Sequence, residues 1–193
     1  MTTIDCRGMA CPAPVISVKK ALLQGGGLRV LLDDGAPREN VTRFAVSKGF
    51  LVSEQRDGEA WELTIQSPGS APADTAPSLS AVSGATLLIA SDRLGDGPDE
   101  LGRLLMRNMI HTLLESDTLP EKLLFLNSGV LLTCEGSPVL EALERLTALG
   151  VEIRSCGLCL DFFNRKEELR AGGTTNMLAT VDALLADSRV IKL

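Results

Sequence analysis

The stretch Asp5-Cys6-Arg7-Gly8-Met9-Ala10-Cys11-Pro12-Ala13-Pro14 joins a short predicted strand to a predicted helix. Residues 3–6 have the pattern of a strand. Pro12 suits the first helical position because the N–H that proline lacks would have no partner there. The helix is expected to run to about Gln24, where the three glycines 25–27 end it. The beginning of the chain is therefore a strand and a helix with a cysteine, Cys11, at the turn between them.

The residues that follow complete a small α/β unit. Apolar patterning predicts a strand over 28–32, a helix over 37–47 and a hairpin over 50–65 that turns at residues 56–59. The resulting order is βαβαββ. Because helices that follow strands usually pack on the sheet, we expect two layers, an open sheet and two helices.

A change in composition follows this unit. Residues 67–83 are rich in Pro, Ser, Ala and Gly and show no periodic apolar pattern, which is typical of a flexible linker. The chain of 193 residues is thereby divided into domains 1–66 and 84–193. Each exceeds the ~40 residues below which a domain usually needs a metal or disulfides, so each can bury its own core.

The second domain alternates apolar strands with helices. Strands are expected at 85–90, 122–126, 151–153 and 189–191, a short apolar run at 130–132, and helices at 98–114, 138–148 and 177–186. This alternation predicts a three-layer α/β/α domain with a mainly parallel sheet. Ligands of such folds bind beyond the carboxyl ends of the strands, so the loops to inspect are 91–97, 127–137 and 154–165.

Composition excludes several classes of function. The formal charge is −6 and no basic run exceeds Lys19-Lys20, so nucleic acid is not an expected partner. No stretch approaches the ~20 apolar residues of a spanning helix, and residues 1–5 do not resemble a signal peptide, so the cytoplasm is expected and a membrane is not. Dinucleotide and phosphate-loop glycine patterns are absent from the sequence, and no cofactor is expected.

Cysteine is the residue type that remains as a candidate for a reactive site. Five cysteines form an odd count, which predicts reduced thiols rather than a disulfide framework. Aromatic residues make up 3% of the chain and His111 is the single histidine, which excludes aromatic stacking platforms and most histidine-based metal sites. No metal is expected.

Cys11 is the first candidate. A cysteine just before the first turn of a helix faces unpaired N–H groups and the positive end of the helix dipole, which favour the thiolate. Arg7 is close in sequence and adds positive charge in this interpretation. The alternative is that Cys11 merely begins the helix, although Ser, Thr, Asp and Asn are the usual residues there.

Cys156-Gly157-Leu158-Cys159 follows the predicted strand 151–153 on a carboxyl-end loop. The pair is compatible with a redox dithiol, half of a zinc site, or a chance pair of buried structural cysteines. Zinc is the weakest of these, because it needs two more ligands and the chain has one histidine. A nucleophilic thiol is the preferred interpretation.

The remaining candidates are interpreted as structural. Cys6 is expected to be a small buried residue at the end of the first strand. Cys134 stands beside Glu135, whose charge disfavours a thiolate. His111 falls on a predicted helix among apolar residues and is expected to be packed or at the surface. Before the last helix, Thr174 or Thr175 is the expected capping residue.

Six residues of the opening stretch resemble a family signature. Asp5, Arg7, Gly8, Cys11, Pro12 and Pro14 match the Asp-x-Arg-Gly-x-x-Cys-Pro-x-Pro motif of the TusA/SirA-like sulfur carriers, whose fold is βαβαββ. The second domain resembles a DsrE/TusD-like domain through residues 128–130, 155–160 and 175–177. The combination is similar to the YedF proteins, described as sulfurtransferase-like selenium-metabolism proteins.

This resemblance implies a carrier of sulfur, or of selenium in its place, as a cysteine persulfide. It places the sulfane sulfur on Cys11 and a second acceptor on Cys156, and gives Cys159 no counterpart. It also implies a trimer or hexamer formed through the DsrE-like domain, and a partner that donates or accepts persulfide, such as a cysteine desulfurase.

These implications lead to the hypothesis of an internal relay between Cys11 and Cys156. A flexible linker of about 17 residues spans roughly 20–25 Å, which permits such a transfer within one chain or between copies. Transfer needs a reactive thiol and no cofactor. Two alternatives stay open, a dithiol redox protein that uses Cys156 and Cys159 and a non-enzymatic interaction or regulatory module.

Overall fold

The chain divides into two compact units between Pro77 and Ser78. The computed structural model describes residues 1–58, 60–67, 81–186 and 189–193. The division falls within the predicted linker, most of which lies outside the described residues. Each unit is described by itself below.

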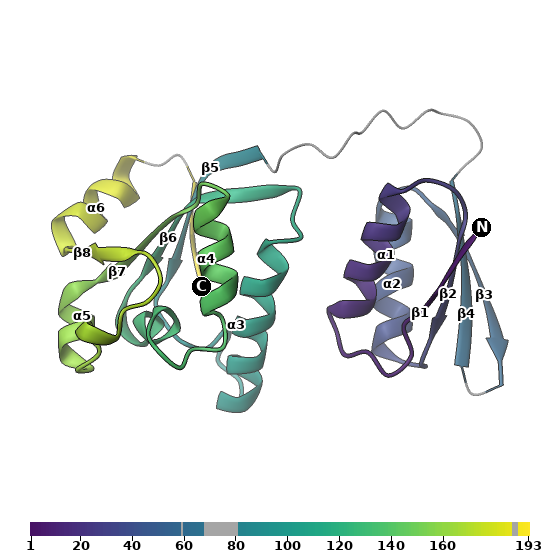
Figure 1. Ribbon diagram of the computed structural model, residues 1–193, viewed down its shortest axis with the longest axis horizontal. Coiled ribbons are helices and arrows are strands. Elements are labelled where there is room, and N and C mark those ends of the chain that lie inside the picture. Colours follow the sequence, from purple (N-terminus) through teal and green to yellow (C-terminus); the bar gives the residue numbers. More distant parts are fainter. Residues whose placement is uncertain (59, 68–80, 187–188) are drawn as a thin grey trace. The chain divides into compact units, whose positions relative to one another are not determined.

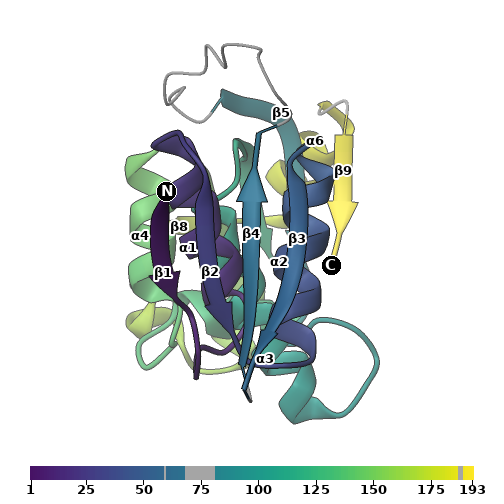
Figure 2. The same ribbon diagram turned by 90° about the vertical axis from the view of Figure 1, so that its right-hand side faces the viewer.

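The first unit has the predicted order βαβαββ. Its elements are β1 (Thr2–Asp5), α1 (Ala13–Leu23), β2 (Leu28–Leu32), α2 (Ala36–Ser47), β3 (Leu51–Asp57) and β4 (Ala60–Gln66). The sheet order is β1-β2-β4-β3, in which β1 and β2 are parallel and the other neighbours antiparallel. Figure 2 shows the four strands side by side in front of α1 and α2, so the expected two layers are confirmed.

The core of this unit lies between the sheet and the two helices. Leu28, Val30 and Leu32 alternate along β2 and are almost fully buried, as the period of a strand requires. Val18 from α1 and Val41 from α2 belong to the same buried cluster. Burial of these aliphatic side chains is the main stabilising contribution in a unit of this size.

The second unit is built around five parallel strands. Its elements are β5 (Ala81–Ile89), α3 (Asp99–Leu113), β6 (Thr118–Phe125), the 3₁₀ helix η1 (Asn127–Thr133), α4 (Leu140–Ala148), β7 (Glu152–Cys156), α5 (Gly157–Phe162), η2 (Lys166–Glu168), β8 (Gly173–Thr175), α6 (Met177–Ala186) and β9 (Arg189–Lys192). The sheet order is β8-β7-β6-β5-β9. Every pair of neighbours is parallel.

This strand order determines the layers. The connections β5-β6 and β6-β7 advance across the sheet, whereas the connection from β8 to β9 returns to the opposite edge. Right-handed crossovers therefore place α3 and α4 on one face and α6 on the other. Figure 1 shows α3 and α4 side by side, and they contact each other. The expected three-layer arrangement is confirmed.

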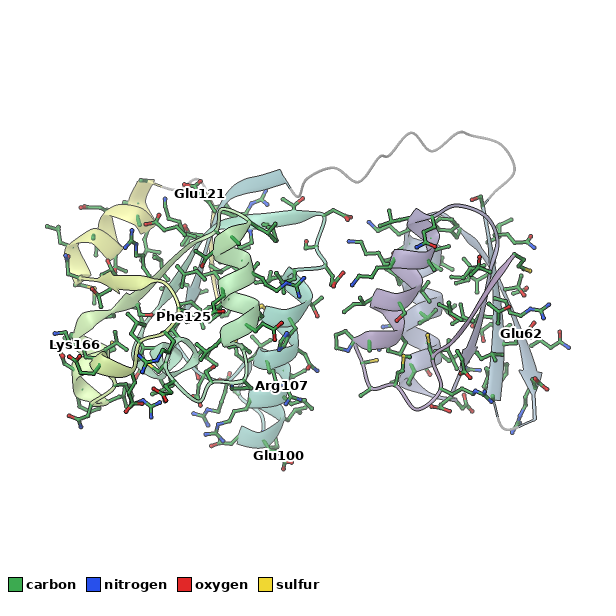
Figure 3. All side chains as sticks on the ribbon, viewed as in Figure 1. Glu62, Glu100, Arg107, Glu121, Phe125 and Lys166 are labelled. Carbon is green, nitrogen blue, oxygen red and sulfur yellow. The ribbon has the colours of Figure 1, made fainter. Side chains whose placement is uncertain are left out.

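The core of the second unit gathers along the central strands. Phe125, the last residue of β6, is fully buried, and Figure 3 shows it in the interior of the unit while Lys166 lies at the periphery. Met106 and Ile110 from α3 and Leu143 from α4 complete the cluster. The carboxyl ends of the strands are thus anchored by buried side chains.

Several elements of this unit differ from expectation. The strand β5 begins at Ala81, inside the predicted linker, because its first residues pair with the beginning of β6 although their composition is not that of a strand. Residues 130–132 lie within η1. The predicted loop 154–165 contains the end of β7 and all of α5. The strand β8 was not predicted, because three residues are too few to show the hydrophobic alternation of a strand.

Candidate functional site

Cys11 lies beyond the carboxyl ends of two parallel strands. After β1, residues 6–12 form a turn that extends the pairing with β2 through a hydrogen bond from the Cys6 N–H to the Leu31 carbonyl, 2.9 Å long. Helix α1 then begins at Ala13. Cys11 is partly exposed in this turn. This edge of a parallel pair is where open α/β sheets place functional residues.

The helix begins one residue later than expected. Pro12 occupies the N-cap position rather than the first helical position, and Pro14 lies within the first turn. The Ala13 N–H is satisfied by the Ala10 carbonyl at 3.0 Å, so a tight turn precedes the helix. Boundaries predicted from sequence commonly err by one or two residues.

A side-chain amide reaches the Cys11 sulfur. Nδ2 of Asn40, on α2, donates a hydrogen bond to Cys11 Sγ at 3.2 Å. Asn40 is itself partly buried, so the donor is held in place by the packing of α2. This hydrogen bond fixes the orientation of the Cys11 side chain in the turn.

Asp5 and Arg7 shape the turn that presents Cys11. The Arg7 guanidinium binds Asp5 through two hydrogen bonds of 2.9 and 2.5 Å, and the Arg7 backbone N–H adds a third of 3.1 Å. The hydrogen bond from the guanidinium is the main reason that the pKa of Asp5 is lowered to about 2, and the backbone hydrogen bond adds to it. Arg7 was expected to supply positive charge near Cys11; that charge is balanced locally by Asp5.

Gly8 ties the turn to the end of β2. Its φ of +72° lies in the left-handed region, which glycine adopts without the strain a side chain brings. Its N–H donates to Oδ2 of Asp33, just after β2, at 2.6 Å. The structure therefore brings Asp5, Arg7, Gly8 and Cys11 together in one turn.

Sequence reasoning missed Asn40 and Asp33. Asp33 directly follows a strand predicted at 28–32, and the rule that carboxyl ends of parallel strands meet was a signal that could have found it. Asn40 stands within a helix, and its position relative to Cys11 depends on how α2 packs. No sequence signal identifies that contact.

Cys156 occupies a different environment from the one expected. It is the last residue of β7, pairs in register with Thr175 of β8 and is followed directly by α5. Its exposed fraction is 1%. The prediction that Cys156 stands in a loop is wrong, because pairing with β8 extends the strand through this residue.

Cys159 is the partly exposed thiol of this second site. It lies in the first turn of α5, and its Sγ accepts a hydrogen bond of 3.1 Å from the backbone N–H of Asn127. Burial raises the pKa of Cys159, and the neighbouring Cys156 thiol raises it further, while the Asn127 N–H opposes the shift.

The segment after β6 positions the Asn127 donor. Asn127 has a φ of +46°, and a Cβ added at Gly129 would lie 2.3 Å from the carbonyl oxygen of Ile89 at the end of β5. Ser128 Oγ donates to Oδ1 of Asp92 at 2.9 Å and accepts the N–H of Asp92 at 3.2 Å. These contacts hold the ends of β5 and β6 together, and so fix the N–H that binds Cys159.

Cys6 is buried, as predicted, and Cys134, which was interpreted as structural, is buried too. Burial is the main cause of the raised pKa of Cys6, and the charge of Asp5 adds to it. Burial also raises the pKa of Cys134, and the acidic neighbour that contributes is Glu168 rather than Glu135. The Cys134 thiol donates to the carbonyl of Val130 at 3.2 Å, which indicates a structural role.

Three further expectations concern metal, His111 and the cap of α6. Across residues 1–58, 60–67, 81–186 and 189–193, no three His, Cys, Asp or Glu side chains are grouped as metal ligands. His111 lies on α3 and is partly buried. The cap of α6 is Asn176, whose Oδ1 accepts the Ala179 N–H at 3.0 Å, rather than Thr174 or Thr175.

No described helix has the length and apolar character needed to cross a membrane.

Comparison with known proteins bears first on the N-terminal unit. Residues 2–67 match the family model described as sulfurtransferase TusA. A SirA-like protein from Desulfitobacterium hafniense is 37% identical over 34% of this chain and 96% of that protein, with a TM-score of 0.33. The N-terminal unit is therefore a TusA-like domain. The Cys11 turn lies within the matched residues, and the match supports a general role in sulfur relay.

Two further solved structures resemble the chain. The YchN protein of E. coli has 17% identity, covers 56% of this chain with 98% of its own length, and has a TM-score of 0.43. A protein of unknown function from Methanobacterium thermoautotrophicum has 15% identity, coverage of 58% and 99%, and a TM-score of 0.44. No curated protein matches the chain.

Proposed function

We propose that this protein carries sulfane sulfur as a persulfide on Cys11 and exchanges it with the thiols of the second unit. The observation that carries the proposal is the TusA-like turn, which presents a partly exposed thiol with the Asn40 amide 3.2 Å from its sulfur. Loading is attack of the Cys11 thiolate on the outer sulfur of a donor persulfide. A new S–S bond forms at Cys11, and the donor leaves as a thiolate.

The Asn40 amide supports both states of this carrier. It donates to the Cys11 sulfur before loading, when a thiolate is the attacking species. Because the amide is neutral, it forms no ion pair with a negatively charged persulfide on Cys11. The outer sulfur is therefore not held by a full opposite charge and can still be transferred. Asn40 is a positioning and stabilising residue in this proposal.

The second unit is proposed to be DsrE-like, which gives the chain the domain arrangement of the YedF proteins. The parallel sheet, the Ser128-Gly129 segment and the thiols at the end of β7 support this assignment. We place the point of exchange at Cys159 rather than at Cys156. Cys159 is partly exposed, whereas Cys156 has an exposed fraction of 1%.

The proposed partners follow from this chemistry. A protein that donates or accepts persulfide, such as a cysteine desulfurase, exchanges sulfur with Cys11, and selenium in place of sulfur uses the same two-electron exchange. Self-association through the second unit is supported by exposed apolar side chains on α6, where Leu178 is 71% and Leu185 is 81% exposed. The cytoplasm is the proposed compartment, since the five cysteines, all among the described residues, form no disulfide.

A second candidate function is a dithiol redox protein. The observation that favours it is the position of the pair, with Cys156 as the N-cap of α5 and Cys159 in its first turn. This candidate predicts a reversible disulfide between the two residues and no role for Cys11. A non-enzymatic interaction module predicts that no cysteine gains sulfur.

Intact mass spectrometry tests the proposal. The full chain, Cys11→Ala and Cys6→Ala are incubated with a cysteine desulfurase and cysteine under conditions that preserve persulfides. We expect a reducible gain of one sulfur atom in the wild type and in Cys6→Ala, whose altered residue is buried in the same unit, and peptide mapping should locate it on Cys11. Sulfur gain by Cys11→Ala at the wild-type rate and amount contradicts the proposal.

A further inference from the structure

The two thiols of the second unit differ in access and lie three residues apart where β7 meets α5. Cys156 is 1% exposed at the end of β7, while Cys159 is partly exposed one turn later in α5. The Cys156 thiol is near enough to raise the pKa of Cys159. A reagent from solvent therefore reaches Cys159 first, and Cys156 is placed to react with whatever Cys159 holds.

The backbone between the thiols suits a disulfide. Cys-x-x-Cys pairs at the start of a helix form the disulfides of thioredoxin-like proteins. Cys156 is the N-cap of α5 and Cys159 lies in its first turn, so this pair has the same spacing at the start of a helix.

A backbone donor fixes the position of the Cys159 sulfur. The N–H of Asn127 donates to Cys159 Sγ at 3.1 Å, and Asn127 is itself fixed by the close approach of Gly129 to Ile89. Cys134, the other cysteine of this unit, donates instead to the carbonyl of Val130 at 3.2 Å. Cys156 is thus the thiol paired with Cys159.

We propose that Cys156 and Cys159 form a reductive release site, which converts a persulfide on Cys159 into hydrosulfide. This proposal rests on the proposed function only for the delivery of sulfur to Cys159. It adds what happens to that sulfur afterwards. The substrate class is sulfane sulfur bound to a thiol, and the product is hydrosulfide with an intramolecular disulfide.

The step balances in atoms and electrons. The Cys156 thiolate attacks Sγ of Cys159, the bond between the two Sγ atoms forms, and the bond from Cys159 Sγ to the outer sulfur breaks. Its electron pair leaves with the outer sulfur as HS⁻, which keeps the persulfide hydrogen. The two cysteine sulfurs are oxidised to a disulfide and the sulfane sulfur is reduced to sulfide. A dithiol reductant reopens the disulfide by thiol–disulfide exchange before the next cycle.

The test uses the full chain with Cys11→Ala and glutathione persulfide as the donor, so that delivery by Cys11 is not required. Without oxygen, one equivalent of donor is expected to give a Cys156–Cys159 disulfide, found by peptide mapping without reduction, together with hydrosulfide. The same chain without donor gives no disulfide. Adding Cys134→Ser is the matched control and is expected to leave the disulfide yield unchanged.

Single substitutions separate the two thiols. With Cys156→Ser, the persulfide is expected to accumulate on Cys159 and hydrosulfide release to fall at least tenfold. With Cys159→Ser, neither persulfide nor disulfide is expected in the second unit. Circular dichroism checks that both variants fold, and Cys156→Ala provides a smaller, apolar replacement if the serine is not tolerated at the buried position.

Two results overturn the proposal. One is release of hydrosulfide by Cys156→Ser or Cys156→Ala at the parental rate, and the other is a persulfide on Cys159 that persists in the chain with both thiols. Either result leaves the loading of Cys11 by a desulfurase unaffected, since that is measured on a different peptide. Failure of the release site and failure of the sulfur carrier are therefore distinguishable.

Discussion

The Cys11 turn and the Cys156–Cys159 pair both lie at carboxyl ends of parallel strands, but the chain leaves the strand differently at each. After β1, residues 6–12 intervene before the helix, and Cys11 is partly exposed with a side-chain donor. After β7, α5 begins at the next residue, so Cys156 is buried and Cys159 receives a backbone donor. An open turn suits exchange with another protein, whereas a strand joined directly to a helix suits chemistry between two neighbouring thiols.

The largest expected contrast between the two regions is in alkylation of the native chain. Cys11 should react roughly a hundredfold faster than Cys6 and Cys134, because buried thiols react only when the structure opens. Cys159 has a raised pKa, so its thiolate is scarce at neutral pH and its reaction should accelerate as the pH rises. Pulsed alkylation at pH 7 and pH 9 with peptide mass spectrometry measures both effects.

The unfolded chain is the control for this measurement. In denaturant all five cysteines should react at similar rates. Labelling of Cys134 as fast as Cys11 in the native chain contradicts the contrast in burial.

A substitution at Gly129 is expected to damage the second region and spare the first. In Gly129→Ala the new Cβ lies 2.3 Å from the Ile89 carbonyl oxygen, so the segment that positions Asn127 must shift. Overpacking of this kind costs about 1–3 kcal/mol in the free energy of unfolding. Trp61, the single tryptophan, belongs to the first unit, so its fluorescence transition should stay while the circular dichroism transition of the second unit moves.

Gly97→Ala is the matched control, because its Cβ meets nothing within 4 Å. If the second unit unfolds at the same point in Gly129→Ala and Gly97→Ala, the close approach of Gly129 to Ile89 is not needed for the stability of that unit.

An intermediate effect is expected at Asn40. Asn40→Asp replaces the donor at Cys11 Sγ by a carboxylate, which disfavours a thiolate by like charge and should slow sulfur loading about tenfold at neutral pH. Raising the pH should restore part of the rate, because thiolate formation then no longer limits it. The loading rate of Asn40→Ala should lie between the rates of the wild type and of Asn40→Asp.

The neighbouring Glu39→Gln controls for a change of charge on α2. A loading rate in Asn40→Asp that equals that of the wild type across the pH range contradicts the role of the amide.

The smallest effect is expected at Arg7. The side chains of Arg7 and Asp5 are each 50% exposed, and they pair with each other. Exposed ion pairs contribute little, so Arg7→Ala should change the rate of loading by less than roughly twofold. A loss as large as that of Asn40→Asp, measured in the same assay, would show that the charge of Arg7 acts directly on sulfur.

The first unit could be predicted almost completely from its sequence, because its segments are strongly periodic and glycines 25–27 and the hairpin turn mark where they end. The second unit was predicted in its long elements only. Its short elements β8 and α5 depend on tertiary pairing, and they decide that Cys156 is buried. Contacts between elements, such as Asn40 with Cys11 and Asn127 with Cys159, leave no local pattern in the sequence.

The central claim is that sulfur enters at the open Cys11 turn and passes to the thiol pair. A time course of desulfurase-loaded full chain, quenched and mapped by peptide mass spectrometry, tests it most directly. The account predicts that sulfane sulfur appears on Cys11 before Cys159, and that Cys11→Ala delays or abolishes the Cys159 signal. Loading of Cys159 in Cys11→Ala at the wild-type rate would contradict it.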